Sequence, residues 1–410
     1  MKINPPTAIA AFVLVGTGAF MAGRISFADT ASSSSNPVIE IKASRTSSRD
    51  GSGSNTAASR LAHASRHDKE TTQDRMARLE SILRGENPLT RSRAMLAFLD
   101  QLGPGEFEAT VARFKSLGLT ESRMGDYSLL LSAWAQADPL AAITYAQNTP
   151  QETFASQTIL TTWANTDPDA AIRWAESQHQ GDGANPYLPG IIRGLADSDP
   201  TRAIALLTGM PRSVERGVGL DFFLPHLLQQ GPDATRAWIA TLTDDSLRNG
   251  AMMRATGPLA TTDPAGTVSW LLANPGEASQ RRIDDVYSTW ASQDSQAAMN
   301  SFSSLAPGND RSNALRGMIS NIAGVDPSAG ISLMDRFPND VNDRVVQSFV
   351  WQSFGKAPAI ALTAISRIGD EGRRGQMYRR TFNAWKENDA SSAANWLVKN
   401  PGMSAIVTPR

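Results

Sequence analysis

The stretch Trp134-Ala135-Gln136-Ala137-Asp138-Pro139 decides the fold, because variants of it return from about residue 125 to the C-terminus. Two clear variants are Trp163-Ala164-Asn165-Thr166-Asp167-Pro168 and Leu259-Ala260-Thr261-Thr262-Asp263-Pro264. Each has an apolar residue, then Ala, two further residues and Asp-Pro, and in most copies another Ala follows four residues after the Asp. A phrase that returns in this way marks a chain built from repeated units.

The repeat has a nearly constant period. The steps between successive reference positions are 29, 32, 32, 32, 31, 32, 31 and 32 residues. A fixed period of this size is typical of supersecondary units, none of which can bury its apolar face alone. The nine reference positions are Asp138, Asp167, Asp199, Gly231, Asp263, Asp294, Asp326, Ala357 and Asp389.

Each unit is predicted to be a helical hairpin. Asp followed by Pro is a helix start, since the carboxylate accepts from first-turn amides and Pro tolerates the first helical position. Apolar residues four and eight positions before the Asp, and five and seven after it, form one stripe on each of two helices. No window alternates with period two for long enough to predict strands. The sequence therefore predicts an all-α fold, an α-solenoid of about nine stacked helical hairpins forming a curved rod or superhelix.

The array resembles the tetratricopeptide-like superfamily of αα-hairpin solenoids over about residues 90–400. That family has a period of 34 residues and a Trp-x2-Leu-Gly-x2-Tyr opening, whereas this chain has a period of 31–32 residues and lacks that opening. The shorter repeat is similar to repeats in bacterial exported proteins. The resemblance implies a role in binding proteins or peptides and transfers no binding residue.

The remaining sequence divides into three segments. Residues 1–28 hold an apolar run at 8–23 and are predicted to be either an uncleaved signal anchor or a cleaved signal peptide. Residues 29–69 are rich in Ser, Thr and Gly and are predicted to be a disordered tether. Residues 70–120 are predicted to hold two N-terminal capping helices, near 70–84 and 88–101, ahead of the repeats at 121–410. A weak repeat copy lies near Gly105, with Phe107 and Phe114.

Composition excludes several classes of function. The formal net charge is −1, which gives no general attraction to nucleic acid, and the chain has no cysteine, which rules out disulfides and thiolate chemistry. No nucleophile elbow, phosphate-binding loop or dinucleotide motif is present. The repeated Asp is interpreted as a helix cap rather than a catalytic acid, since it recurs at a helix start in seven of nine units. We therefore expect no enzymatic activity, no cofactor and no metal.

The candidate partner-binding face is the polar stripe of the first helix of each unit. An ordinary solvated face is the competing interpretation, and Trp351 is the exceptional member because it is an aromatic residue on a polar stripe. The eight candidates are Arg193, Asp197, His226, Arg254, Asp285, Trp351, Arg380 and Glu387.

Three functions remain open. The first is an exported, membrane-tethered, non-catalytic scaffold whose repeats lie outside the cytoplasm and bind protein or peptide partners. If the signal is cleaved, the protein is instead secreted or periplasmic. The alternatives are a cell-envelope protein that binds or hydrolyses polysaccharide, and a structural spacer without a specific ligand.

Overall fold

The computed structural model describes residues 71–149 and 153–407, and residues 70–410 form one compact unit. The described residues contain 22 α-helices, α2 to α23, with four short 3-10 helices and no strand. The predicted all-α hairpin fold is confirmed. The predicted signal segment at 1–28 and the tether at 29–69 lie outside the described residues.

Three helices precede the regular hairpins: α2 (Thr72–Leu83), α3 (Pro88–Leu99) and α4 (Phe107–Ser116). The first two match the predicted pair. Asn87 begins α3 as expected, since its side chain accepts from the Thr90 amide at 3.1 Å and Pro88 occupies the first turn. The weak repeat copy corresponds to α4, which buries Phe107 and Phe114.

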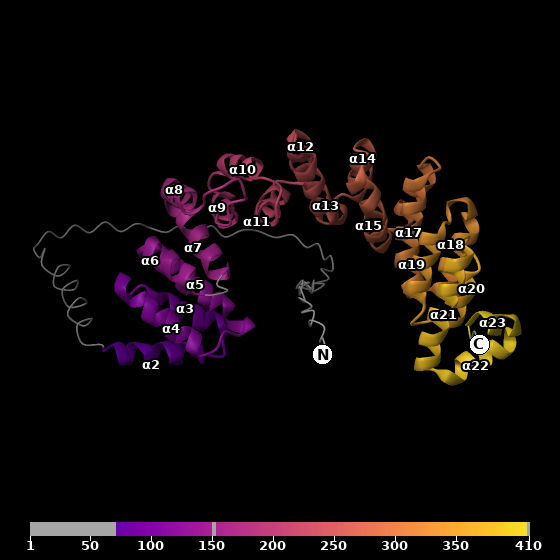
Figure 1. Cartoon of the computed structure of the whole chain (residues 1–410), viewed down its shortest axis with the longest axis horizontal. Helices are drawn as coiled ribbons and strands as arrows, with labels where there is room; N and C mark the ends of the chain where they lie inside the picture. The colour runs from indigo at the N-terminus through magenta and orange to yellow at the C-terminus, as the bar shows by residue number, and fades with distance from the viewer. Residues whose placement is uncertain (1–70, 150–152, 408–410) are drawn as a thin grey trace, which may run out of the picture. The chain divides into compact units, whose positions relative to one another are not determined.

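Nine hairpins follow in chain order in the described part (Figure 1). Their first helices are α5 (Met124–Ala137), α7 (Thr153–Thr166), α9 (Leu188–Leu195), α11 (Val214–Gln229), α13 (Asp245–Thr262), α15 (Glu277–Gln293), α17 (Asn309–Val325), α19 (Asp343–Ser353) and α21 (Glu371–Asn388). Their second helices are α6 (Pro139–Asn148), α8 (Pro168–Gln178), α10 (Pro200–Gly209), α12 (Pro232–Thr241), α14 (Pro264–Ala273), α16 (Ser295–Ser304), α18 (Pro327–Arg336), α20 (Pro358–Ile365) and α22 (Ala390–Lys399). The remaining elements are η1 (Pro104–Glu106), η2 (Glu121–Arg123), η3 (Pro338–Asp340), η4 (Pro401–Met403) and α23 (Ser404–Val407).

The repeated Asp links the two helices of a hairpin. In the first copy the Asp138 amide donates to the Trp134 carbonyl at 2.8 Å, which ends α5. The Asp138 carboxylate accepts from the Ala141 amide at 3.0 Å, which begins α6. The same side-chain bond recurs at all seven Asp reference positions and is absent at Gly231 and Ala357. The predicted capping role is confirmed, and it accounts for the repetition of the Asp.

The hairpins stack mainly through their first helices. Each first helix from α5 to α17 packs on the first helix of the next unit, while each second helix packs on its own partner and on the following first helix. The series breaks at the end, where α19 and α21 make few close contacts and α21 packs on α20, α22 and α23.

Two of the stacked pairs approach each other closely at glycines. A Cβ added at Gly317 of α17 would lie 2.0 Å from the Asp284 carbonyl oxygen of α15. A Cβ at Gly194 of α9 would lie 2.3 Å from the Thr161 carbonyl oxygen of α7. Only glycine permits these backbone contacts.

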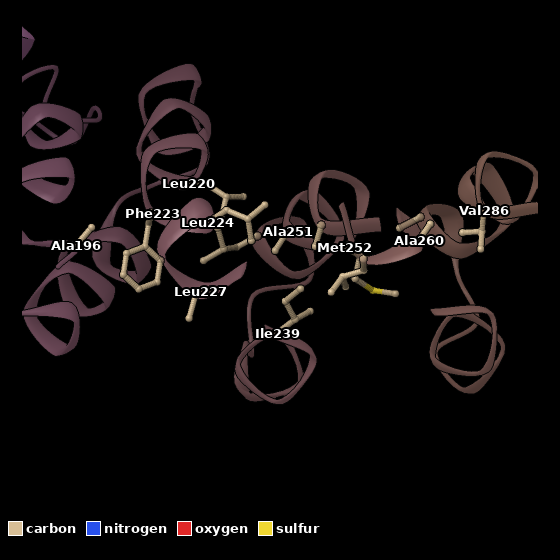
Figure 2. Packing of buried hydrophobic residues seen from close by; sticks show 14 of the residues in the cluster. Ala196, Leu220, Phe223, Leu224, Leu227, Ile239, Ala251, Met252, Ala260 and Val286 are labelled. Atoms are coloured by element: carbon tan, nitrogen blue, oxygen red, sulfur yellow. The ribbon is translucent and has the colours of Figure 1, made fainter. Parts of the chain in front are cut away.

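The core is a continuous line of apolar side chains along the stack. Figure 2 shows this packing from Ala196 through Phe223 and Leu224 of α11 to Met252 of α13 and Val286 of α15. Four of the repeat tryptophans are buried: Trp134, Trp163, Trp290 and Trp385. Four more are partly buried against the core: Trp174, Trp238, Trp270 and Trp396. The predicted packing role of these eight is confirmed.

Candidate functional site

The eight predicted face residues lie on first helices or, for Asp197, directly after one. Seven are exposed and His226 is half-buried. The structure does not gather all eight into one site. It brings together two pairs, Asp197 with His226 and Trp351 with Arg380.

The histidine pair links two neighbouring units. His226 Nδ1 lies 2.8 Å from Asp197 Oδ1, and His226 Nε2 lies 2.7 Å from Gln230 Nε2. Because the amide of Gln230 donates, Nε2 accepts and Nδ1 carries the proton toward Asp197. Both ring nitrogens are therefore engaged in structural hydrogen bonds.

Three other candidates have local partners. Arg254 of α13 forms an ion pair with Asp221 of α11. Asp285 pairs with Arg282 one turn earlier on α15, at 2.6 Å. The Arg193 guanidinium lies 5.1 Å from the centre of the Phe222 ring. These residues stabilise the surface of the stack, and Glu387 is exposed near the end of α21.

Trp351 and Arg380 line one cavity between α19 and α21 with a volume of about 480 Å³. Trp351 is 75% exposed, which sets it apart from the other eight tryptophans. Its apolar neighbours in the lining are Val350, Phe354, Met377 and Ala384, and its polar neighbours are Gln347, Arg373, Gln376 and Thr381.

The cavity exists because the stacking pattern fails there. α19 has 11 residues, whereas α17 and α21 have 17 and 18, so α19 offers a shorter surface to its neighbours. Its unit also carries Ala357 where most units carry the capping Asp. Since α19 and α21 make few close contacts, the side of α19 that carries Trp351 lacks the close stacking on the next first helix that the earlier units have.

The lining is cationic and contains no acidic residue. Neither Arg373 nor Arg380 forms an ion pair or a side-chain hydrogen bond among the described residues. The amides of Gln347 and Gln376 are likewise without a protein partner there.

Tyr378, also on α21 but outside the lining, is buried, and burial raises the pKa of its hydroxyl, which therefore stays protonated.

Two of the lining residues, Trp351 and Arg380, were predicted from the sequence, and the others were not. The predicted stripe ends nine residues before the reference position, whereas Gln347, Gln376 and Arg373 lie further upstream. Steps of three, four or seven residues from Trp351 and Arg380 lead to Gln347, Phe354, Gln376, Met377, Arg373 and Ala384. These steps follow one face of a helix, so the signal was present in the sequence.

Two further hollows occur in the described part. A polar one of about 760 Å³ lies across α15, α17, α19 and α21, and shares Arg373 with the Trp351 cavity. A smaller one of about 360 Å³ lies between α3 and α5 and includes Leu96, which is 49% exposed.

Among residues 71–149 and 153–407, no group of three or more His, Asp or Glu side chains is arranged to hold a metal ion. No helix in the same ranges combines the length and the apolar character needed to cross a bilayer.

No protein-family model, curated protein or solved structure matches this chain. The fold itself defines the class, an all-α protein whose helices pack in sequential pairs as stacked hairpins.

Proposed function

We propose that this protein is a non-catalytic helical-repeat scaffold that binds a protein or peptide partner in the cavity between α19 and α21. The observation that carries the proposal is Trp351, a tryptophan 75% exposed beside a cavity with an apolar wall and cationic side chains. Exposed aromatic residues with adjacent arginines are typical of the residues that dominate binding energy at protein interfaces.

The energetics favour an occupant with an apolar side chain. Val350, Phe354 and Met377 provide an apolar wall within a concave site. Burying one large apolar side chain there contributes about 1.5–3 kcal/mol. Covering Trp351 adds to this, since aromatic side chains bring large contact area at little cost in conformational entropy.

The repeats are also proposed to be a short-period relative of tetratricopeptide-like arrays. The support is the sequential pairing of helices in the structure and the period of 31–32 residues. The apolar run at residues 8–23 supports the further proposal that the N-terminus directs the protein into or across a membrane, with the repeats outside the cytoplasm.

Site-specific photo-crosslinking tests the binding proposal in the full chain. A photoreactive amino acid replaces Gln376, an exposed residue of the lining. The matched control replaces Val214 of α11, which is 78% exposed and lies outside the cavity. We expect a discrete crosslinked species from position 376 in the producing cells and none of the same mass from position 214.

The second arm adds Trp351→Ala to the position 376 variant. Because Trp351 is largely exposed, this change should alter the free energy of unfolding by only about 0.5 kcal/mol or less. We expect it to abolish the crosslinked species. A species that persists in Trp351→Ala, or that forms equally from position 214, would contradict the proposed site, as would the absence of any species from position 376.

A further inference from the structure

We propose that the occupant of the cavity between α19 and α21 is an acidic peptide segment, one large apolar side chain flanked by carboxylates. This inference rests on the proposed function and adds the chemistry of the partner. It follows from the way in which the apolar and the charged residues are divided within the lining.

The apolar part of the cavity comes from both helices. Trp351, Val350 and Phe354 come from α19, and Met377 and Ala384 come from α21. An apolar group that enters between the helices is therefore contacted from two sides. The cavity of about 480 Å³ has room for a Leu or Phe side chain together with adjoining backbone.

The charged part of the cavity comes from α21 alone. Arg373 and Arg380 are seven residues apart, so they lie on the same face of α21, about 10 Å apart along its axis. An extended peptide rises about 3.3 Å per residue, so two carboxylates about three residues apart match this spacing. Arg and carboxylate can form paired hydrogen bonds, which makes carboxylate the fitting partner.

Within residues 71–149 and 153–407, no acidic side chain forms an ion pair with these two arginines. Asp370, the N-cap residue before α21, accepts from the Arg373 backbone amide at 2.7 Å. Glu277, which shares the neighbouring polar hollow with Arg373, pairs with Arg281 at 2.6 Å. Glu371 pairs with Arg374, and Asp343 accepts from the Gly369 amide at 2.8 Å. α21 as a whole carries five cationic side chains and two carboxylates. The excess positive charge is therefore free to attract an acidic ligand.

The polar groups of the lining favour a polypeptide over a lipid surface. Gln347 of α19 and Gln376 of α21 both line the cavity, and neither amide has a protein partner in the described part. Each amide offers a donor and an acceptor, the groups that a peptide backbone requires. Apart from the exposed Trp351, the apolar residues are recessed, since Val350 is buried and Phe354 and Met377 are half-buried. The lining therefore offers one exposed aromatic side chain and no broad apolar face of the kind that enters a bilayer.

A selection experiment with charge reversal tests this inference. Random peptides displayed on phage are selected on the compact unit of residues 70–410, which contains the whole described core. Parallel selections use Trp351→Ala, the double variant Arg373→Glu/Arg380→Glu, and Arg212→Glu. Arg212 is an exposed arginine in the loop before α11, so its substitution serves as the charge-change control.

We expect the unmodified unit and Arg212→Glu to select peptides with one large apolar residue flanked by Asp or Glu. The double variant should select Lys or Arg at the flanking positions, and it should bind the acidic peptides about tenfold more weakly, as expected for loss of two exposed ion pairs. Trp351→Ala should select neither group.

Two other outcomes would distinguish the inferred acidic preference from the proposed binding of a peptide at Trp351. Peptides that depend on Trp351 but show no acidic preference would overturn the inference and leave the binding function standing. Absence of any Trp351-dependent peptide would overturn both. If the unit instead bound vesicles containing phosphatidylserine through Arg373 and Arg380 and selected no peptide, the ligand would be a membrane surface and the peptide inference would be wrong.

Discussion

The capping Asp is the residue on which each hairpin depends. Its amide ends one helix and its carboxylate begins the next, so a single position satisfies backbone groups of both helices. At Asp263 hydrogen bonds from Arg236 and from the Gly266 amide also lower the pKa of the carboxyl, which favours its ionised form. Two of the nine reference positions, Gly231 and Ala357, have no capping side chain.

Introducing Asp at the two reference positions that lack it should change the free energy of unfolding at one of them and not stabilise the other. Ala357 has φ −145° and ψ 68°, close to the φ −146° and ψ 72° of the capping Asp199. Ala357→Asp should therefore raise the free energy of unfolding by about 0.5–2 kcal/mol. Gly231→Asp should not stabilise, because Gly231 has φ +105°, a conformation that L side chains rarely adopt.

Chemical denaturation of both variants measures these free energies. Asp167→Ala completes the set and should cost about 0.5–2 kcal/mol by loss of the cap. Equal effects at Ala357 and Gly231, or no loss in Asp167→Ala, would show that the side-chain cap contributes little to stability.

At the scale of helices, the close approach of α15 and α17 depends on Gly317. Gly317→Ala should cost about 1–3 kcal/mol, because the added Cβ meets the Asp284 carbonyl and the helices must move apart. Gly125→Ala is the matched control, since Gly125 lies in α5 with nothing within 4 Å of an added Cβ and is not followed by proline. That change should stabilise by about 0.5–1 kcal/mol through helix propensity.

Thermal or denaturant unfolding of the two variants measures these changes in the free energy of unfolding. Stabilisation by Gly317→Ala would mean that α15 and α17 are further apart than described. Destabilisation by Gly125→Ala equal to that of Gly317→Ala would remove close packing as the cause.

The hairpins could be predicted from sequence because their signals are local. Asp-Pro, the apolar residue four positions before it and the Ala four after it all lie within one unit, and they correctly predict the helices around Asp138 and Asp167. The cavity depends instead on contacts between units. Nothing within the unit around Ala357 shows that α21 packs on α20 and leaves Trp351 exposed, so only its polar-stripe position pointed to it.

Across the whole array, contacts are made between neighbours in the chain. Such an array grows by adding units and does not require one central core. The array can therefore tolerate an irregular contact between two neighbouring units, since the units on either side keep their own contacts. The sparse contact between α19 and α21 is such an irregularity, and the cavity lined by Trp351 is formed there.

The stacking of each first helix on the next underlies both the fold and the cavity, and engineered disulfides test it most directly. The chain has no cysteine, so any disulfide is unambiguous. Ser132 Oγ of α5 lies 3.1 Å from Thr162 Oγ1 of α7. Ser132→Cys/Thr162→Cys should therefore oxidise readily within one chain, since facing side chains this close suit disulfide geometry.

The control pair is Ser132→Cys/Ser292→Cys, which joins the first unit to the sixth, on α15. We predict rapid oxidation of the first pair and no disulfide within the chain for the second. Failure of the first pair to oxidise, or equal oxidation of both pairs, would contradict the sequential stacking of the hairpins.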